Sequence, residues 1–235
     1  MAGTRSDLPA RTASAIIMIV VVGMALWFGG MAFTVLVLAG SAMLVWEWKG
    51  IVDRFPDDPR TRQVWLALGV CYVVLAALAI LKLDESGRFL PILAAVIATD
   101  IGAYFAGRTI GGPKIAPSIS PSKTWAGLGG GMTASAALLL GAYTWVAWQF
   151  RDYGGRPGPD WFAPKIGLLM VAMGAGIAVV AQAGDFFESW AKRRAGVKDS
   201  GTWIPGHGGL FDRVDGLLLA CIVSLFVAWI ARSVL

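Results

Sequence analysis

Long apolar runs are the feature of this sequence that most constrains its fold. A helix that spans a bilayer needs about 20 mostly apolar residues. Residues 13–46 carry no charged side chain, and the pair Gly29-Gly30 divides them into two short spans, 13–28 and 31–46. Five further runs follow, at 64–81, 89–106, 126–149, 165–183 and 216–233. We therefore expect an all-α, polytopic integral membrane protein with about seven transmembrane helices.

Composition excludes several other classes of protein. Of the 235 residues, 57% are apolar and 15% are charged, whereas soluble domains average about 45–50% apolar and about 25% charged residues. A soluble enzyme and a nucleic-acid-binding module are both excluded, so the expected surroundings are a lipid bilayer and no nucleic acid. The two cysteines, Cys71 and Cys221, lie in separate apolar runs, which argues against a disulfide framework and against a cysteine-based zinc site.

The distribution of Lys and Arg predicts the orientation in the membrane. Fourteen of the 20 lie on the side that holds 1–12, 47–63, 107–125 and 184–215. The positive-inside bias places this side, including the N-terminus, in the cytoplasm. The first run follows Arg5 and Arg11 and also resembles a signal peptide, but it continues beyond any cleavage point. We expect a single integral domain over 1–235 in the cell (inner) membrane.

A polar cluster at 184–215 is the first candidate for chemistry. The helix at 165–183 is expected to continue to Arg194 and to end at Gly196. Its turns would place Asp185, Glu188, Ser189 and Lys192 on one face, and Asp212 and Asp215 would open the last helix. The same segment contains the bases and the single histidine of the chain: Arg193, Arg194, Lys198, Arg213 and His207.

Carboxylates at two helix ends can share one divalent cation. Magnesium prefers oxygen ligands and is usually completed by water and substrate phosphates. The glycines at 206, 208 and 209 would let backbone amides approach an anion closely. The alternative is a solvated loop with helix-capping acids, and for Asp212 alone this alternative is equally tenable. A single histidine such as His207 is also more often structural than catalytic.

A second polar cluster lies at 99–125 on the same expected side. Asp100 is deep in an apolar run, where an ionisable group is costly and is a functional hypothesis by default. Tyr104 and Arg108 extend its helix face, and a turn-rich loop with Ser120, Lys123 and Thr124 suits phosphate recognition. A Ser/Pro loop that merely caps a helix would look similar. No P-loop motif is present, so a P-loop ATPase is unsupported.

Together these segments resemble the signature of phosphatidate cytidylyltransferases, the CDP-diacylglycerol synthases. The resemblance covers 99–125 and 184–216. It rests on Asp100-x-x-Ala-Tyr104-x-x-Gly-Arg108, Ser120-Pro-Ser-Lys123-Thr124, Gly184-Asp185-x-x-Glu188-Ser189-Trp-Ala-Lys192-Arg193, Lys198-Asp199 and Pro205-Gly-His207-Gly208-Gly209-Leu-Phe-Asp212-Arg213-Val-Asp215. One departure is Ala126, because the family often carries Glu at this position.

The resemblance implies transfer of a cytidylyl group from CTP to phosphatidate, with Mg²⁺ as cofactor. It implies Asp185 and Asp212 as metal ligands, with Asp215 as a further candidate, and it implies that Asp100 contacts those ligands or binds a second cation. The implied catalytic set is Asp185, Asp212, Lys192, Lys198, Asp199 and His207. The implied substrate-binding set is Ser120, Lys123, Thr124, Ser189, Arg193, Gly208, Gly209 and Arg213.

Two other functions are weighed against this hypothesis. A transporter or channel would suit Asp100 within a helix, but it leaves unexplained why charges gather in two loops on one side. A CDP-alcohol phosphotransferase would require Asp-Gly-x-x-Ala-Arg, whereas Asp215-Gly216 is followed by Leu219-Ala220-Cys221. A second cation and a homodimer both stay open.

Overall fold

The computed structural model describes residues 8–152, 164–204 and 208–234. In these residues the chain forms seven helices, all long and apolar enough to cross a membrane. They are α1 (Leu8–Phe28), α2 (Gly30–Val52), α3 (Pro59–Glu85), α4 (Phe89–Thr109), α5 (Trp125–Asp152), α6 (Pro164–Arg194) and α7 (Phe211–Val234). The expectation of an all-α polytopic membrane protein with about seven spans is confirmed.

Several helices continue beyond the apolar runs that predicted them. Helix α2 ends at Val52 rather than at residue 46, and α3 begins at Pro59 rather than at 64. Asp58 caps α3, since its Oδ1 accepts hydrogen bonds from the amides of Arg60 at 2.9 Å and Thr61 at 3.2 Å. The Thr61 hydroxyl and these amides hold the pKa of the Asp58 carboxyl below its ordinary value. A polar side chain that accepts hydrogen bonds from the first amides of a helix therefore allows the helix to begin before its apolar segment.

The end of α6 follows its prediction. The helix stops at Arg194, and Gly196 has a φ of 68°, in the left-handed region that glycine adopts without strain. The amide of Val197 donates to the carbonyl of Lys192 at 3.0 Å, which closes the last turn. Asp185, Glu188, Ser189 and Lys192 consequently share one helix, as expected.

A short β-hairpin joins α4 to α5, where the sequence predicted only a turn-rich loop. Its strands are β1 (Lys114–Ala116) and β2 (Ser120–Thr124), paired antiparallel with Lys114 opposite Thr124. The Thr124 hydroxyl accepts a hydrogen bond from the Gly127 amide at 3.0 Å and so caps α5. The hairpin thereby leads directly into a membrane-spanning helix.

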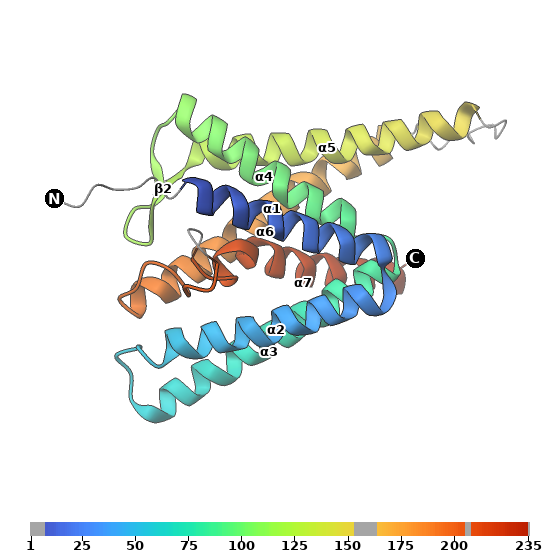
Figure 1. The fold of residues 1–235 in the computed structure, drawn as a ribbon. Coiled ribbons are helices and arrows are strands. Elements are labelled where there is room, and N and C mark those ends of the chain that lie inside the picture. The colour runs from blue at the N-terminus through green and yellow to red at the C-terminus, as the bar shows by residue number, and fades with distance from the viewer. Residues whose placement is uncertain (1–7, 153–163, 205–207, 235) are drawn as a thin grey trace.

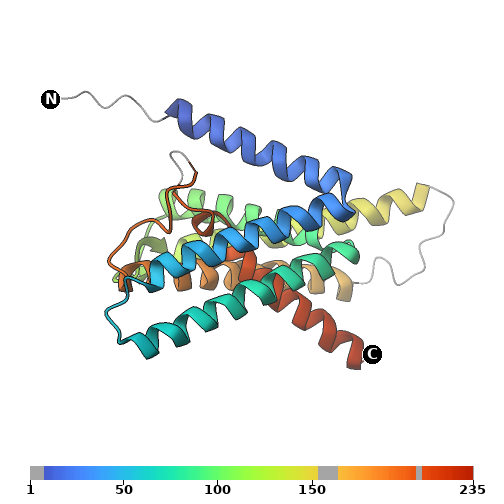
Figure 2. The same ribbon diagram turned by 60° about the horizontal axis from the view of Figure 1, so that its bottom comes forward.

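The α2–α3 connection, the hairpin and the end of α6 gather at one end of the helix bundle. Figure 1 shows the α2–α3 connection, the hairpin and the end of α6 on the left, while the helices extend to the right. The pairs α4–α5, α5–α6 and α6–α7 pack most extensively. Helix α1 packs mainly on α2 and stands apart from the remaining helices in Figure 2. Both polar clusters of the sequence are therefore brought to the same end.

Glycines permit the closest helix contacts. A Cβ atom at Gly102 in α4 would lie 2.5 Å from the carbonyl oxygen of Gly130 in α5. A Cβ at Gly184 in α6 would lie 2.5 Å from the carbonyl oxygen of Asp215 in α7. Small residues let helix backbones approach closely within a membrane. The second contact matters for the site because it sets α6 directly against the start of α7.

A cluster of buried and partly buried aromatic side chains lies near the polar end of the bundle. It joins α2, α3, α6 and α7 with the segment between α2 and α3. Trp48 is its centre, with ring centroids 5.8 Å from Phe187 and 6.1 Å from Phe211. The other members are Phe55, Trp65 and Trp190. Aromatic packing thus joins these helices near the polar end.

Candidate active site

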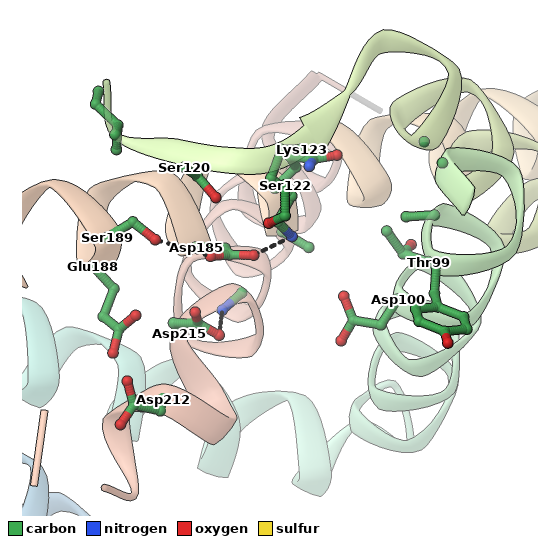
Figure 3. A pocket seen from close by; sticks show the side chains of 18 of the residues that line it. Thr99, Asp100, Ser120, Ser122, Lys123, Asp185, Glu188, Ser189, Asp212 and Asp215 are labelled. Carbon is green, nitrogen blue, oxygen red and sulfur yellow. Dashed lines mark hydrogen bonds and ion pairs between the residues drawn. The ribbon is translucent and has the colours of Figure 1, made fainter. Parts of the chain in front are cut away.

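A polar cavity of about 820 Å³ lies at the end of the bundle where the connections gather. Helices α4, α6 and α7 and strand β2 contribute its walls, and Figure 3 shows their side chains converging from these elements. Its volume suits a drug-sized or nucleotide-sized ligand. The lining unites both polar clusters of the sequence: Asp100, Tyr104, Arg108, Ser120, Lys123, Thr124, Asp185, Glu188, Ser189, Lys192, Arg193, Lys198, Asp199, Asp212, Arg213 and Asp215.

Three carboxylates in this cavity form a compact group. Asp185 and Glu188 come from successive turns of α6, and Asp215 comes from the first turns of α7. One oxygen of each lies within 4.8 Å of the others. The close approach of the two helices at Gly184 produces this proximity. We call Asp185, Glu188 and Asp215 the carboxylate triad.

The carboxylate triad has the donor set of a divalent-cation site. Glu188 is 1% exposed, and its Oε1 has no hydrogen-bond partner among the described residues. A buried carboxylate oxygen without a donor is costly unless a cation satisfies it. Oxygen ligands of this kind suit Mg²⁺, which keeps further positions for water and phosphate. Glu188 was predicted on the correct helix face but not as a ligand, although its i, i+3 spacing from Asp185 was the available signal.

Asp212 lies beside the triad in the same cavity but is engaged in other contacts. Its Oδ1 accepts a hydrogen bond from Lys192 Nζ at 2.6 Å. Its Oδ2 accepts from the Ser200 amide and hydroxyl, each at 3.0 Å, and from the Gly209 amide at 2.8 Å. The triad therefore brings Asp185 together with Asp215 and Glu188, while Asp212 anchors the segment that precedes α7.

Lysine side chains balance the acids of the cavity. Lys192 Nζ also lies 2.6 Å from Glu188 Oε2, so it bridges Glu188 and Asp212. Lys123, from β2, forms an ion pair with Asp185, drawn as a dashed line in Figure 3. Asp100 lines the wall formed by α4, across the cavity from Asp185. Acids and bases are thus interleaved, and the lining offers ligands for a cation and for anions.

Two further bases have hydrogen-bond partners near the cavity. Arg193 Nε donates to the carbonyl oxygen of Ile119 at 3.4 Å, which ties α6 to the hairpin. Arg108 Nη1 donates to the Tyr104 hydroxyl at 3.0 Å, one turn earlier on α4. Ser120 and Thr124 are buried along β2, and Ser189 donates to Asp185 Oδ1 at 3.4 Å. Most of the predicted substrate-binding residues therefore reach this cavity.

Gly208 and Gly209, which the sequence predicts to approach a phosphate, instead lie against the Asp212 carboxylate. Gly209 donates its amide to Asp212, and a Cβ at Gly208 would lie 2.7 Å from Asp212 Oδ2. Gly208 has a φ of 83°. Among the residues that the structure describes, neither glycine lines the cavity. His207 lies outside the described residues, as do Pro205 and Gly206.

Glu47 contacts the segment before α7, although no motif of the sequence includes it. It is 2% exposed and accepts hydrogen bonds from the amides of Leu210 and Phe211, both at 2.8 Å. Its Oε2 also lies 3.1 Å from Ser200 Oγ, whose single hydroxyl proton is shared between Glu47 and Asp212. Glu47 directly follows the uncharged run 13–46, so the sequence predicts a loop position for it. Its place between Trp46 and Trp48, at the end of a span, was the signal for burial.

Fold and site together define an integral membrane protein with a polar cavity that contains both clustered carboxylates and basic side chains. A model of the cytidylyltransferase family matches residues 60–231. The chain belongs to the cytidylyltransferase family, and the resemblance stated from its motifs is confirmed.

Curated relatives are similar over most of this chain. The phosphatidate cytidylyltransferase of Brucella suis biovar 1 is 41% identical over 202 residues, which cover 83% of this chain and 65% of that protein. The chain thus spans slightly less than two thirds of the length of this relative. The phosphatidate cytidylyltransferase of Rickettsia felis is 31% identical over 205 residues, 86% of this chain and 84% of that protein. That of Rickettsia bellii is 31% identical over 229 residues, 95% and 91% respectively.

Proposed function

We propose that this protein transfers a cytidylyl group from CTP to phosphatidate, giving CDP-diacylglycerol and pyrophosphate for phospholipid synthesis. The observation that carries the proposal is one cavity in which the carboxylate triad lies among Lys123, Lys192 and the other bases of both motifs. Relatives that align with 83% or more of this chain are named phosphatidate cytidylyltransferases. A cavity of this composition fits a triphosphate and a phosphomonoester together.

The proposed reaction is an in-line displacement at phosphorus. An oxygen of the lipid phosphate forms a bond to the α-phosphorus of CTP, while the bond from that phosphorus to the bridging oxygen of the β-phosphate breaks. Pyrophosphate leaves with the electron pair. A phosphate monoester has a second pKa of about 6, so the nucleophile is already largely anionic near neutral pH. The protein therefore needs to position and neutralise its substrates more than to supply a strong base.

A divalent cation fits the carboxylate triad, and Mg²⁺ is the one we propose. Asp185, Glu188 and Asp215 would hold it, since one oxygen of each lies within 4.8 Å of the others and Glu188 Oε1 is buried without a hydrogen-bond partner among the described residues. A cation held there would supply positive charge for the phosphate oxygens. Asp100 lines the opposite wall and would hold a water or a second cation there.

The bases of the cavity would orient the phosphates. We assign phosphate contacts to Lys123, Arg193, Lys198 and Arg213, because all four line the cavity beside the triad. Ser120, Ser189, Thr124 and Asp199 complete the polar lining and would contact substrate oxygens or bound water. Lys192 bridges Asp212 and Glu188, so we assign to it the positioning of both carboxylates beside its proposed phosphate contact, and we keep Asp212 as a further candidate metal ligand in the same cavity.

The proposed site lies at the cytoplasmic surface of the cell (inner) membrane. Most Lys and Arg residues belong to segments at this end of the bundle, which the positive-inside bias assigns to the cytoplasm. Soluble CTP would enter from the cytoplasm, and phosphatidate would enter from the adjacent leaflet. Both substrates can then meet without leaving their own phase.

A direct assay tests the proposal. Purified full-length protein in detergent is incubated with labelled CTP, phosphatidate and Mg²⁺, and the organic phase is analysed for labelled lipid. We expect labelled CDP-diacylglycerol with an equal amount of pyrophosphate. No labelled lipid from folded protein, or equal yields without phosphatidate, would overturn the assignment.

A further inference from the structure

Glu47 makes the longest-range polar contact of the site region. It lies near the end of α2, and its three partners lie more than 150 residues later in the chain. It is buried, and it is not among the described residues that line the cavity. The family model begins at residue 60, so the matched region does not include Glu47. A buried carboxylate in this position requires a physical explanation.

The first role of Glu47 is to cap α7. The amides at a helix start have no acceptor within the helix and carry partial positive charge. Glu47 Oε1 accepts the Leu210 amide and Oε2 accepts the Phe211 amide, both at 2.8 Å. A carboxylate from another helix thereby fixes where α7 begins. Asp212 and Asp215, in the first turns of α7, are positioned by the same contact.

A second contact extends from Glu47 toward the carboxylate triad. Ser200 Oγ lies 3.1 Å from Glu47 Oε2 and 3.0 Å from Asp212 Oδ2. Asp212 is in turn bonded to Lys192, and Lys192 to Glu188. The packing is tight, because a Cβ at Gly201 would lie 2.7 Å from Glu47 Oε1. A continuous set of polar contacts therefore connects α2 with Glu188.

We propose that Glu47 is a positioning residue for the transfer reaction, a role that rests on the proposed function. It holds the start of α7 and, through Ser200, keeps Asp212 and Lys192 in the arrangement that orients Glu188. Loss of this contact shifts carboxylates of the triad without removing any of them. Small displacements of reacting groups cost up to about 100-fold in rate.

Steady-state kinetics of Glu47→Ala in the full chain test this role. We expect kcat to fall by about 100-fold while KM for CTP changes much less, because the cavity lining is retained. Glu47→Gln keeps one carbonyl oxygen and should restore part of the loss, with kcat about 10-fold below the wild type. Asp53→Ala removes an exposed acid at the end of the same helix and should leave kcat unchanged.

Hydrogen exchange provides a readout that does not depend on turnover. Loss of the acceptor should speed exchange of the Leu210 and Phe211 amides in Glu47→Ala and leave them protected in Asp53→Ala. Ser200→Ala keeps the cap and the contact from the Ser200 amide to Asp212, but it removes the hydroxyl that lies between Glu47 and Asp212, so kcat should fall while the Leu210 and Phe211 amides stay protected. If Glu47→Ala does not fold, Ser200→Ala decides the role in positioning.

The outcomes separate this inference from the proposed function. A folded wild-type protein that makes no CDP-diacylglycerol refutes the proposed function and the positioning role together. An active wild type with wild-type kcat in folded Glu47→Ala, or in Ser200→Ala, overturns the positioning role alone. Unchanged amide exchange in Glu47→Ala overturns the cap.

Discussion

Lys192 Nζ lies 2.6 Å from Asp212 Oδ1 and joins the end of α6 to the start of α7. The same ammonium group lies 2.6 Å from Glu188 Oε2. The two carboxylate side chains are 7% and 2% exposed, so Lys192 is the cation that neutralises two nearly buried acids. Loss of the Lys192 ammonium group should destabilise the fold, because water cannot reach the Glu188 and Asp212 carboxylates to replace it.

Replacing Lys192 should therefore damage stability and activity together. We expect Lys192→Met to lower the free energy of unfolding by about 3–5 kcal/mol, because it leaves two uncompensated buried carboxylates. Thermal unfolding in detergent measures the change. Lys49→Met, which breaks an exposed ion pair with Asp53, is the control and should cost less than about 1 kcal/mol. Equal melting temperatures for the two variants would contradict the central role of Lys192.

Removal of the divalent cation should abolish activity reversibly. We expect a chelator to stop formation of labelled lipid and added Mg²⁺ to restore it. Asp215→Asn removes one charge from the carboxylate triad, so more Mg²⁺ should be needed for half-maximal rate. Asp53→Asn should leave the Mg²⁺ requirement as in the wild type. An unchanged Mg²⁺ requirement in Asp215→Asn would exclude Asp215 as a ligand.

The contact between α4 and α5 should tolerate no side chain at Gly102. We expect Gly102→Ala to destabilise the protein by about 1–3 kcal/mol, because its Cβ would lie 2.5 Å from a backbone oxygen. Gly129→Ala is the matched control in α5, since its Cβ would meet nothing within 4 Å. Thermal unfolding of the two variants compares them. A melting temperature for Gly102→Ala at or above that of Gly129→Ala would refute the close packing.

Arg194 should not be replaceable by lysine. It forms a two-pronged ion pair with Asp57, at 2.7 and 3.1 Å, and its guanidinium lies 5.4–6.0 Å from the ring centres of Phe55, Trp65 and Trp190. Lysine reproduces neither the paired hydrogen bonds nor the planar stacking. We expect Arg194→Lys to cost about 1–2 kcal/mol in unfolding experiments. If Arg194→Lys is as stable as the wild type, a positive charge at residue 194 is sufficient and the guanidinium geometry is not required.

The two cysteines should be dispensable for turnover. Cys221 is buried in α7 and Cys71 is exposed on α3, and neither is among the described residues that line the cavity. We expect Cys71→Ala and Cys221→Ala to keep wild-type kcat in the labelled-CTP assay. A loss of kcat in folded Cys71→Ala would reveal a role for its thiol that the geometry does not suggest.

Most spans and the residue types of the site could be read from the sequence. The helix end at Arg194 and Gly196 was also predictable, because a C-cap is a local property of a few residues. The hairpin at 114–124 was not predicted, since its pairing depends on where the ends of α4 and α5 lie. The place of Glu188 in the triad was missed because helical spacing defines a face but not what the face meets.

Sequence alone determined the membrane class, the span positions and the family, because apolar length and motif residues are carried by contiguous chain. Only the tertiary structure decided which acids meet. The close approach of α6 and α7 at Gly184 brings Asp215 to Asp185 and Glu188, while Lys192 and Ser200 engage Asp212. The burial of Glu47 against Leu210 and Phe211 is likewise a tertiary result, because contacts across more than 150 residues arise only when the helices pack.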